Sequence, residues 1–377
     1  MVDWRGNRHG ETFTFKRVRW STFAETDEEI ATYTQFTGGS IEYGAYTALK
    51  CTGSFDYVGT PPDTVDLLRV YYSFTDDAGE TAEPVALGTF FLGYDSATNT
   101  RAGDELLSQG SVTGYGTLKV LQDRLCGLPM TVPAGSDPVA LAAQIVEGFG
   151  LRANYPKDTD YSLNAPHTFE AEDSYLTVCN WLLTNCSTQY QSLYVDGYGV
   201  VQIQPYEEPT ARTPRQTFAD DERSIMLSEV EEESDWQTAP NVVRLYFESD
   251  TCAMWACARN LSGGPASLDV RGGREVTYYE QIDEIDGLDA LKALAVTRLK
   301  DKSGGVEHVT MTHAYVPLGA GDAAAVQYRD RGWRGNVQNM RLTLEPSVPT
   351  QTQLRRFVPA ALSVEVTGGV LWQVEEE

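Results

Sequence analysis

The sequence predicts a mainly β protein that contains a smaller α/β module. Two observations carry this prediction. Short segments that alternate polar and apolar residues recur between glycine-containing turns, which is typical of strands. The chain also holds 33 Gly and 20 Tyr with many Val and Thr, a composition that favours strands and tight turns. At 377 residues it exceeds one ordinary domain.

Residues 1–115 are predicted to form a first β domain. The segment 12–16 alternates threonine and phenylalanine before Lys16, as a half-buried strand does. Two longer strands are expected at 65–74 and 85–94, joined by a turn at 76–80. Six or seven short strands at such spacing indicate a small barrel or sandwich.

At residue 116 the hydrophobic period changes, and 116–205 are interpreted as an α/β module. Leucines recur at helical spacing from Leu118 to Leu128. Asp137 followed by Pro138 is typical of a helix start, because the carboxylate caps free N–H groups and proline suits the first helical position. A hairpin with a glycine turn is expected at 192–203.

The remaining chain is divided into three parts. The stretch 206–235 is rich in acidic residues and is interpreted as a linker. Residues 236–346 are predicted to form a second β domain with one helix at 288–300. The last part, 347–377, is expected to be a linker and a closing hairpin.

The charge excludes two classes of partner. The chain carries 29 Lys and Arg against 54 Asp and Glu, a net charge of −25. A duplex-DNA-binding protein needs the opposite sign, and an anionic membrane surface repels such a chain. No apolar segment of about 18 residues exists, so we expect no membrane span. The first residues lead into a polar segment with no short apolar region, so we expect no signal peptide.

Two charged segments are candidate binding sites. The basic N-terminal segment is either a solvated edge strand or an arm that docks on an acidic neighbour, through Arg5, Arg8, Arg17 and Arg19. The acidic segment is a mobile loop, a metal site or a belt facing a channel. Its channel-facing candidates are Asp220, Asp221, Glu222, Glu231, Glu232 and Glu233. Calcium would require a glycine turn at defined spacing, and the acidic run has none.

No catalytic motif is present, and we expect neither an enzyme nor a cofactor. Serine-hydrolase, nucleotide-binding and zinc-protease signatures are absent from the sequence. Paired carboxylates such as Glu172 with Asp173 could serve a glycosidase, but the pair looks like a helix start. The six cysteines are interpreted as free buried thiols, with a zinc site that uses Cys252 and Cys257 or Cys179 and Cys186 as the alternative.

The order of motifs in 236–346 resembles the second half of phage tail hub proteins, also called baseplate hub proteins. The matching features, in order, are Pro240-Asn241-Val242-Val243, Ala258-Arg259-Asn260, Ser267, Gly273-Arg274, the helix at 288–300, a strand with histidine and Gly321-Asp322. Two further segments look like parts of the hub family: Leu87–Leu92 and the hairpin around Asp196-Gly197.

The resemblance covers roughly 1–346 and implies two tube-type β-barrel domains in one chain. Three chains would then form a homotrimeric hub that matches a sixfold tail tube and leaves a channel for DNA. The implied partners are the distal tail or tube protein, the tape-measure C-terminus and a central spike or fibre. The implied location is the tail tip of the virion, after assembly in the host cytoplasm. The chain lacks the C-terminal fibre or enzyme domain of some relatives, which leaves spike attachment open.

Two other functions remain open at this stage. The protein could bind carbohydrate of the host wall at the tail tip, which an exposed aromatic cluster in a groove would favour. The third alternative is an enzyme that hydrolyses the host cell wall. Because DNA is a polyanion, a hub channel is expected to be net negative.

Overall fold

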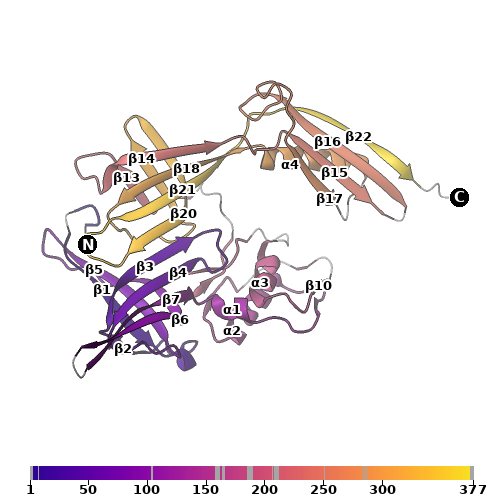
Figure 1. Cartoon of the computed structure of the whole chain (residues 1–377). Helices are drawn as coiled ribbons and strands as arrows, with labels where there is room; N and C mark the ends of the chain where they lie inside the picture. The colour runs from indigo at the N-terminus through magenta and orange to yellow at the C-terminus, as the bar shows by residue number, and fades with distance from the viewer. Residues whose placement is uncertain are drawn as a thin grey trace. The chain divides into compact units, whose positions relative to one another are not determined.

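The computed structural model of the chain divides into two compact units (Figure 1). Unit 1 comprises residues 1–230 and 310–354, and unit 2 comprises residues 231–309 and 355–377. The structure describes residues 3–6, 8–102, 105–157, 162–163, 166–184, 190–205, 207, 212–249, 251–282, 285 and 287–373.

The first half of unit 1 is an antiparallel sheet in the order β3-β4-β7-β6-β5-β1-β2. These strands are β1 (Arg8–Val18), β2 (Glu29–Tyr33), β3 (Phe36–Gly44), β4 (Cys51–Val58), β5 (Leu67–Asp76), β6 (Val85–Ala102) and β7 (Glu105–Gly116), with the 3-10 turn η1 (Trp20–Thr22) after β1. Their alternate residues meet in one core. The Phe55 and Phe90 rings lie 5.1 Å apart, and so do those of Phe15 and Phe36.

The α/β module packs its helices against one end of this sheet. Its elements are α1 (Lys119–Asp123), β8 (Met130–Val132), α2 (Pro138–Gly148), β9 (Ala153–Asn154), β10 (His167–Phe169), α3 (Tyr175–Thr184), β11 (Tyr194–Val195) and β12 (Val201–Gln202). The predicted cap is confirmed: the Asp137 carboxylate accepts from the Val139 and Ala140 N–H groups at 2.9 and 3.1 Å. The helices share a core with Val18 and Leu67 of the sheet.

A buried arginine joins the module to the sheet. Arg69 on β5 is almost wholly buried, and its Nη2 donates to Asp27 Oδ1 at 2.5 Å and to the Tyr198 carbonyl at 2.9 Å. Its Nε donates to Thr89 Oγ1 at 2.9 Å, and that hydroxyl in turn donates to the Gly197 carbonyl at 3.0 Å. The hairpin turn 196–199 is therefore held against β5 and β6 by hydrogen bonds.

The second half of unit 1 continues the same sheet. Its strands are β13 (Gln216–Ala219), β19 (Ala323–Tyr328), β20 (Arg331–Thr343) and the unit 1 parts of β14 (Met226–Asp235), β18 (Gly305–His313) and β21 (Thr350–Val358). The junction is β3 with β20, where Ile41 faces Leu342 and Glu42 faces Arg341. The result is one 13-stranded sheet that runs from β14 to β2, with β13 and β19 branching from β20. The mainly β class with a smaller α/β module is thus confirmed.

Unit 2 is a four-stranded sheet with a helix on one face. Its elements are β15 (Val242–Glu248), β16 (Cys252–Ser262), β17 (Thr277–Ile282), α4 (Leu288–Lys302) and β22 (Ser363–Gln373). The strand order is β17-β15-β16-β22. Leu291, Ala295 and Leu299 of α4 pack on alternate residues of β15 and β16. Figure 1 places the helix beside this sheet.

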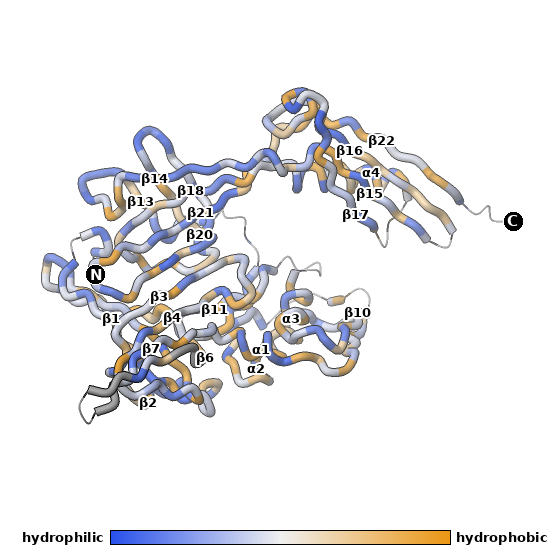
Figure 2. The backbone as a smooth tube through the Cα atoms, in the orientation of Figure 1, coloured by the Kyte–Doolittle hydropathy of each residue, from blue (hydrophilic) through white to orange (hydrophobic). Residues whose placement is uncertain are grey.

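The predicted segment boundaries differ from these units in two places. The predicted second domain, 236–346, is shared between them, because 236–309 lies in unit 2 and 310–346 in unit 1. The predicted linker, 206–235, contains β13 and β14. Figure 2 shows that β14 is mainly hydrophilic, so its sequence carries no apolar alternation. Of the helices in the described chain, none has the length and apolar character to cross a membrane.

Candidate assembly surfaces

One face of the unit 1 sheet is polar and exposed across β7, β4, β3, β20 and β21. Side chains of a strand alternate between faces, so buried Ile41 and Leu342 define the core side. On the other side Ser40 pairs with Ser54 and Thr343. The positions that make up this polar face are Ser40, Glu42, Thr52, Ser54, Asp56, Ser111, Thr113, Thr310, Asn339, Arg341, Thr343, Gln351 and Gln353.

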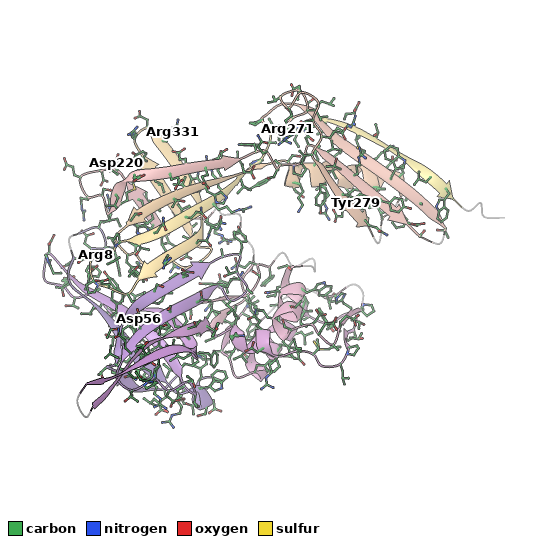
Figure 3. All side chains as sticks on the ribbon, in the orientation of Figure 1. Arg8, Asp56, Asp220, Arg271, Tyr279 and Arg331 are labelled. Atoms are coloured by element: carbon green, nitrogen blue, oxygen red, sulfur yellow. The ribbon has the colours of Figure 1, made fainter. Side chains whose placement is uncertain are left out.

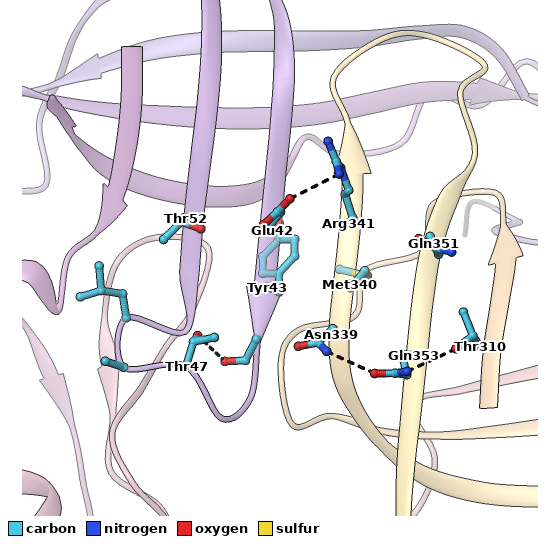
Figure 4. Close-up of a pocket in the computed structure, with 13 residues that line it drawn as sticks. Glu42, Tyr43, Thr47, Thr52, Thr310, Asn339, Met340, Arg341, Gln351 and Gln353 are labelled. Atoms are coloured by element: carbon cyan, nitrogen blue, oxygen red, sulfur yellow. Dashed lines mark hydrogen bonds and ion pairs between the residues drawn. The ribbon is translucent and has the colours of Figure 1, made fainter. Parts of the chain in front are cut away.

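Hydrogen bonds link the polar face across strands (Figure 4). Asn339 Nδ2 donates to Gln353 Oε1 at 3.2 Å, and Gln353 Nε2 donates to Thr310 Oγ1 at 3.4 Å. The one charged pair among these positions is Glu42 with Arg341, whose nearest atoms are 3.6 Å apart. The face therefore presents mainly hydroxyl and amide groups, with the Glu42–Arg341 pair and the exposed carboxylate of Asp56 as its charged groups.

A cavity of about 480 Å3 opens on the polar face. Its lining includes Tyr43, Thr47 and Thr52 from the first half and Asn339 and Gln353 from the second. These groups donate and accept hydrogen bonds, but none is an activated nucleophile or a general base with a positioned partner. Chemically, these groups can hold water or contact a polar surface.

The four arginines of the predicted docking segment all contact acidic groups of their own chain. Arg8 is the most enclosed, with a side chain only 6% exposed and its guanidinium over the Phe74 ring at 4.9 Å (Figure 3). It also donates to the Tyr72 hydroxyl at 3.2 Å and lies 3.9 Å from Glu11. Arg8 thus belongs to the interior of unit 1, which leaves it little surface for a partner.

The other three arginines are more accessible. Arg17 contacts Asp63 at 2.5 Å and Asp66 at 2.7 Å, and Arg19 contacts Glu28 at 3.1 Å. Arg5 binds Asp221 at 2.5 Å, so the structure joins one residue of the predicted basic set to one of the predicted acidic set. The hydrogen bond from Arg5 lowers the pKa of Asp221.

The predicted channel-facing acidic residues fall into two groups. Asp220, Asp221 and Glu222 lie in the turn between β13 and β14 in unit 1. The group 231–233 lies on the part of β14 that belongs to unit 2. Because strand side chains alternate, Glu231 and Glu233 point to one side of β14 and Glu232 points to the other. These three glutamates therefore cannot all face one channel.

The buried titratable side chains of His313 and Cys179 are packed inside the protein core. His313 lies between the Ala314 carbonyl, to which Nδ1–H donates at 2.7 Å, and the Thr352 hydroxyl, 2.8 Å from Nε2. Burial lowers the pKa of His313 to about 4, so the ring is neutral at pH 7. Burial raises the pKa of the Cys179 thiol to about 12, which makes it a poor nucleophile.

The cysteines and other possible metal ligands do not gather. Cys51, Cys126, Cys179, Cys252 and Cys257 are free thiols, and Cys186 lies outside the described residues. No group of three or more His, Cys, Asp or Glu side chains able to hold a metal occurs in the described ranges.

The polar face was not predicted from the sequence. Its residues come from strands on both sides of the β3–β20 junction, 300 residues apart in the chain. The sequence shows the polar face only within single strands. In β21, for example, Gln351 and Gln353 alternate with buried Thr350, Thr352 and Leu354. Such alternation identifies an exposed side of one strand, but it does not say which strands lie beside it.

Comparison with solved structures identifies the fold. The chain is similar to a tail protein from Neisseria meningitidis MC58, with 14% identity, a TM-score of 0.59 and coverage of 93% of this chain and 97% of the other. It is also similar to the 43 kDa tail protein of prophage MuSo2 from Shewanella oneidensis, with 12% identity, a TM-score of 0.60 and coverage of 92% and 98%. No protein-family model matches the sequence, and no curated protein matches it. The chain thus shares the fold of these two tail proteins along nearly its whole length.

Proposed function

We propose that the protein is a structural component of a bacteriophage tail tip. In this proposal three copies form a hub that joins the sixfold tail tube or distal tail ring to a threefold central spike or fibre. The observation that carries it is the continuous sheet of unit 1, in a fold shared with phage tail proteins. Two sheet halves per chain in three chains give six halves around one axis, which matches a sixfold ring without any reaction.

We propose further that the polar face lines the channel through which DNA passes. DNA carries a negative charge about every 1.7 Å of axis, so inward Lys or Arg side chains would retain it. Hydroxyl and amide groups stay hydrated and give no net attraction, and the Glu42–Arg341 pair is balanced. Asp220 and Glu222, together with either Glu232 or the pair Glu231 and Glu233, are candidates for a second, repulsive part of the channel, while Asp221 is paired with Arg5.

The proposed partners follow from this position in the virion tail. They are the distal tail or tail tube protein, the tape-measure C-terminus and the spike or fibre protein, while DNA passes without specific binding. The protein would assemble in the host cytoplasm and act without catalysis. Docking through the basic segment is proposed for Arg5, Arg17 and Arg19, because Arg8 is enclosed in unit 1.

Stoichiometry in assembled tails tests the hub. Purified tails should contain three copies per particle, measured by quantitative mass spectrometry against a tail protein of known copy number. Image reconstruction of the same tails should place unit 1 around the axis with the polar face inward. Six copies, one copy, or a polar face turned outward would each contradict the proposed hub.

Carbohydrate binding is the second candidate function, and one observation favours it. Trp255, Tyr279 and Trp372 are exposed on unit 2, and aromatic rings are common in sugar-binding sites (Figure 3 labels Tyr279). Retention of the wild-type protein on host cell-wall glycan, and its loss in a Trp255→Ala variant, would support this function. Equal retention of both proteins would remove it.

A further inference from the structure

We infer that strand β22 of unit 2 is an intermolecular edge that pairs with β17 of a second copy of this chain. The inference rests on the proposed trimer and names the strands that would hold it together. Both strands are edges of the unit 2 sheet, since the order is β17-β15-β16-β22. Within the described residues, β22 pairs with β16 and β17 pairs with β15.

The first argument is the apolar surface that β22 leaves uncovered. Val364, Val366 and Val370 are 36%, 41% and 47% exposed, Leu371 is 58% exposed and Trp372 is 41% exposed. Val366 and Val370 lie opposite Ala258 and Met254, on the side of the sheet that α4 packs against, and they stay about half exposed although α4 also contacts β22. A long apolar edge is a template for another strand, and stable proteins cover such edges or charge them.

The second argument is charge, which indicates that a second copy of this chain can bind the β22 edge. Each chain carries −25, so two copies repel each other wherever carboxylates face carboxylates. The eleven residues of β22 include one charged residue, Glu365. The six residues of β17 include Glu280, which Arg298 neutralises through bonds of 2.8 and 3.1 Å. The two edges therefore combine little charge with a large apolar area, which suits contact between like-charged copies.

The third argument is strand direction. β15 is parallel to β17, and β16 is antiparallel to both β15 and β22, so β22 and β17 run in the same direction. Rotation about an axis along the strands preserves that direction. A β22–β17 contact between copies is thus a parallel pairing that joins different surfaces. Repeated around a rotation axis, such a contact closes into a ring.

Charged substitutions on β22 test the inference on the full chain. Val370→Glu with Leu371→Glu should raise the protein concentration needed for trimer formation about tenfold or more, because each edge contact would bury carboxylates. Val270→Glu is the control, since Val270 is an exposed valine of unit 2, 64% accessible, that lies outside the sheet. Circular dichroism and the thermal transition establish that the variants are folded, and light scattering measures assembly.

Crosslinking identifies the partner strand. A photoreactive residue in place of Val366 should link to peptides that contain 277–282 of another copy. Links to 363–373 of another copy, or an unchanged trimer in the β22 variant, would overturn the inference while the hub proposal stands. A wild-type protein that is monomeric both in solution and in tails would overturn both.

Discussion

Arg69 shows how a single charged side chain fixes two parts of unit 1. Its guanidinium donates hydrogen bonds to Asp27, Thr89 and the Tyr198 carbonyl, which belong to three separate segments. A planar guanidinium with five donors can do this, while an ammonium cannot. The arginine is therefore a structural residue, although buried charges in proteins also occur at functional sites.

We expect Arg69→Met to lower the unfolding free energy by about 2–3 kcal/mol. Removing one partner of a buried ion pair costs about 3–5 kcal/mol of unfolding free energy. The loss is smaller here, because Asp27 still forms an ion pair with Arg152, whose Nη2 lies 2.9 Å from Asp27 Oδ2. Arg19→Met is the control: its pair with Glu28 is exposed, so the loss should stay below about 1 kcal/mol. Urea unfolding measures both variants, and equal losses would refute the structural role of Arg69.

The lowered pKa of buried His313 predicts that the folded protein loses stability in mild acid. The folded pKa is about 4 against an ordinary 6.5, so the unfolded chain binds this proton first as the pH falls. The contribution of the neutral ring is fully present above pH 6.5, and falls by about 3 kcal/mol as the pH drops to 4.

The His313→Gln variant removes this titration. Its unfolding free energy should depend less steeply on pH between 6.5 and 4 than that of the wild type, by up to one proton. The two proteins are compared by denaturant unfolding at several pH values, so a general loss of stability in the variant shifts the curve without changing its slope. Parallel curves would show that another group governs acid unfolding.

At the scale of elements, the turn 196–199 fastens the module to the sheet through a glycine. A Cβ atom at Gly197 would lie 1.9 Å from the Ala86 carbonyl oxygen, which is backbone and cannot swing away. The turn itself is held by Asp196, whose carboxylate accepts from the Tyr198 and Val200 N–H groups at 3.0 and 2.9 Å.

We expect Gly197→Ala to lower the unfolding free energy by about 1–3 kcal/mol, as other overpacked sites do. Gly148→Ala is the matched control, because Gly148 has nothing within 4 Å of the added methyl and ends helix α2. Thermal unfolding of the two variants gives the comparison. A Gly197→Ala protein as stable as the control would show that the turn is not seated on β6.

At the scale of the whole molecule, the polar face makes a prediction about DNA passage. Gln351→Lys with Gln353→Lys adds two positive charges per chain, or six per trimer, to the proposed channel lining. DNA ejection from phage carrying this variant should be slower, and raised salt should restore part of the rate because screening weakens the attraction.

The control for this experiment carries the same charge elsewhere. Ser21→Lys with Ala24→Lys places two lysines on exposed positions near η1, away from the polar face. Both variants should assemble tails in normal number, so that ejection alone differs. Equal ejection rates in both variants would contradict the assignment of the polar face to the channel.

Local sequence rules determined much of the secondary structure. The predicted strand 65–74 became β5 at Leu67–Asp76, the helix at 288–300 became α4, and Asp137 caps α2. These elements depend on capping groups and apolar periods within a few residues, which a single sequence displays directly.

The way in which these elements combine depends on contacts between distant segments of the chain. Residues 229–235 of β14 are almost all acidic, so their sequence does not predict a strand. They nevertheless form one, because backbone hydrogen bonds to β18 stabilise the extended conformation. The division at 230 and 309, and the joining of β3 to β20, depend equally on contacts between distant segments. Periodicity fixes which residues of a strand share a face, while strand order and partner choice arise from long-range packing and hydrogen bonding. The polar face and the β22 edge therefore became visible only in three dimensions.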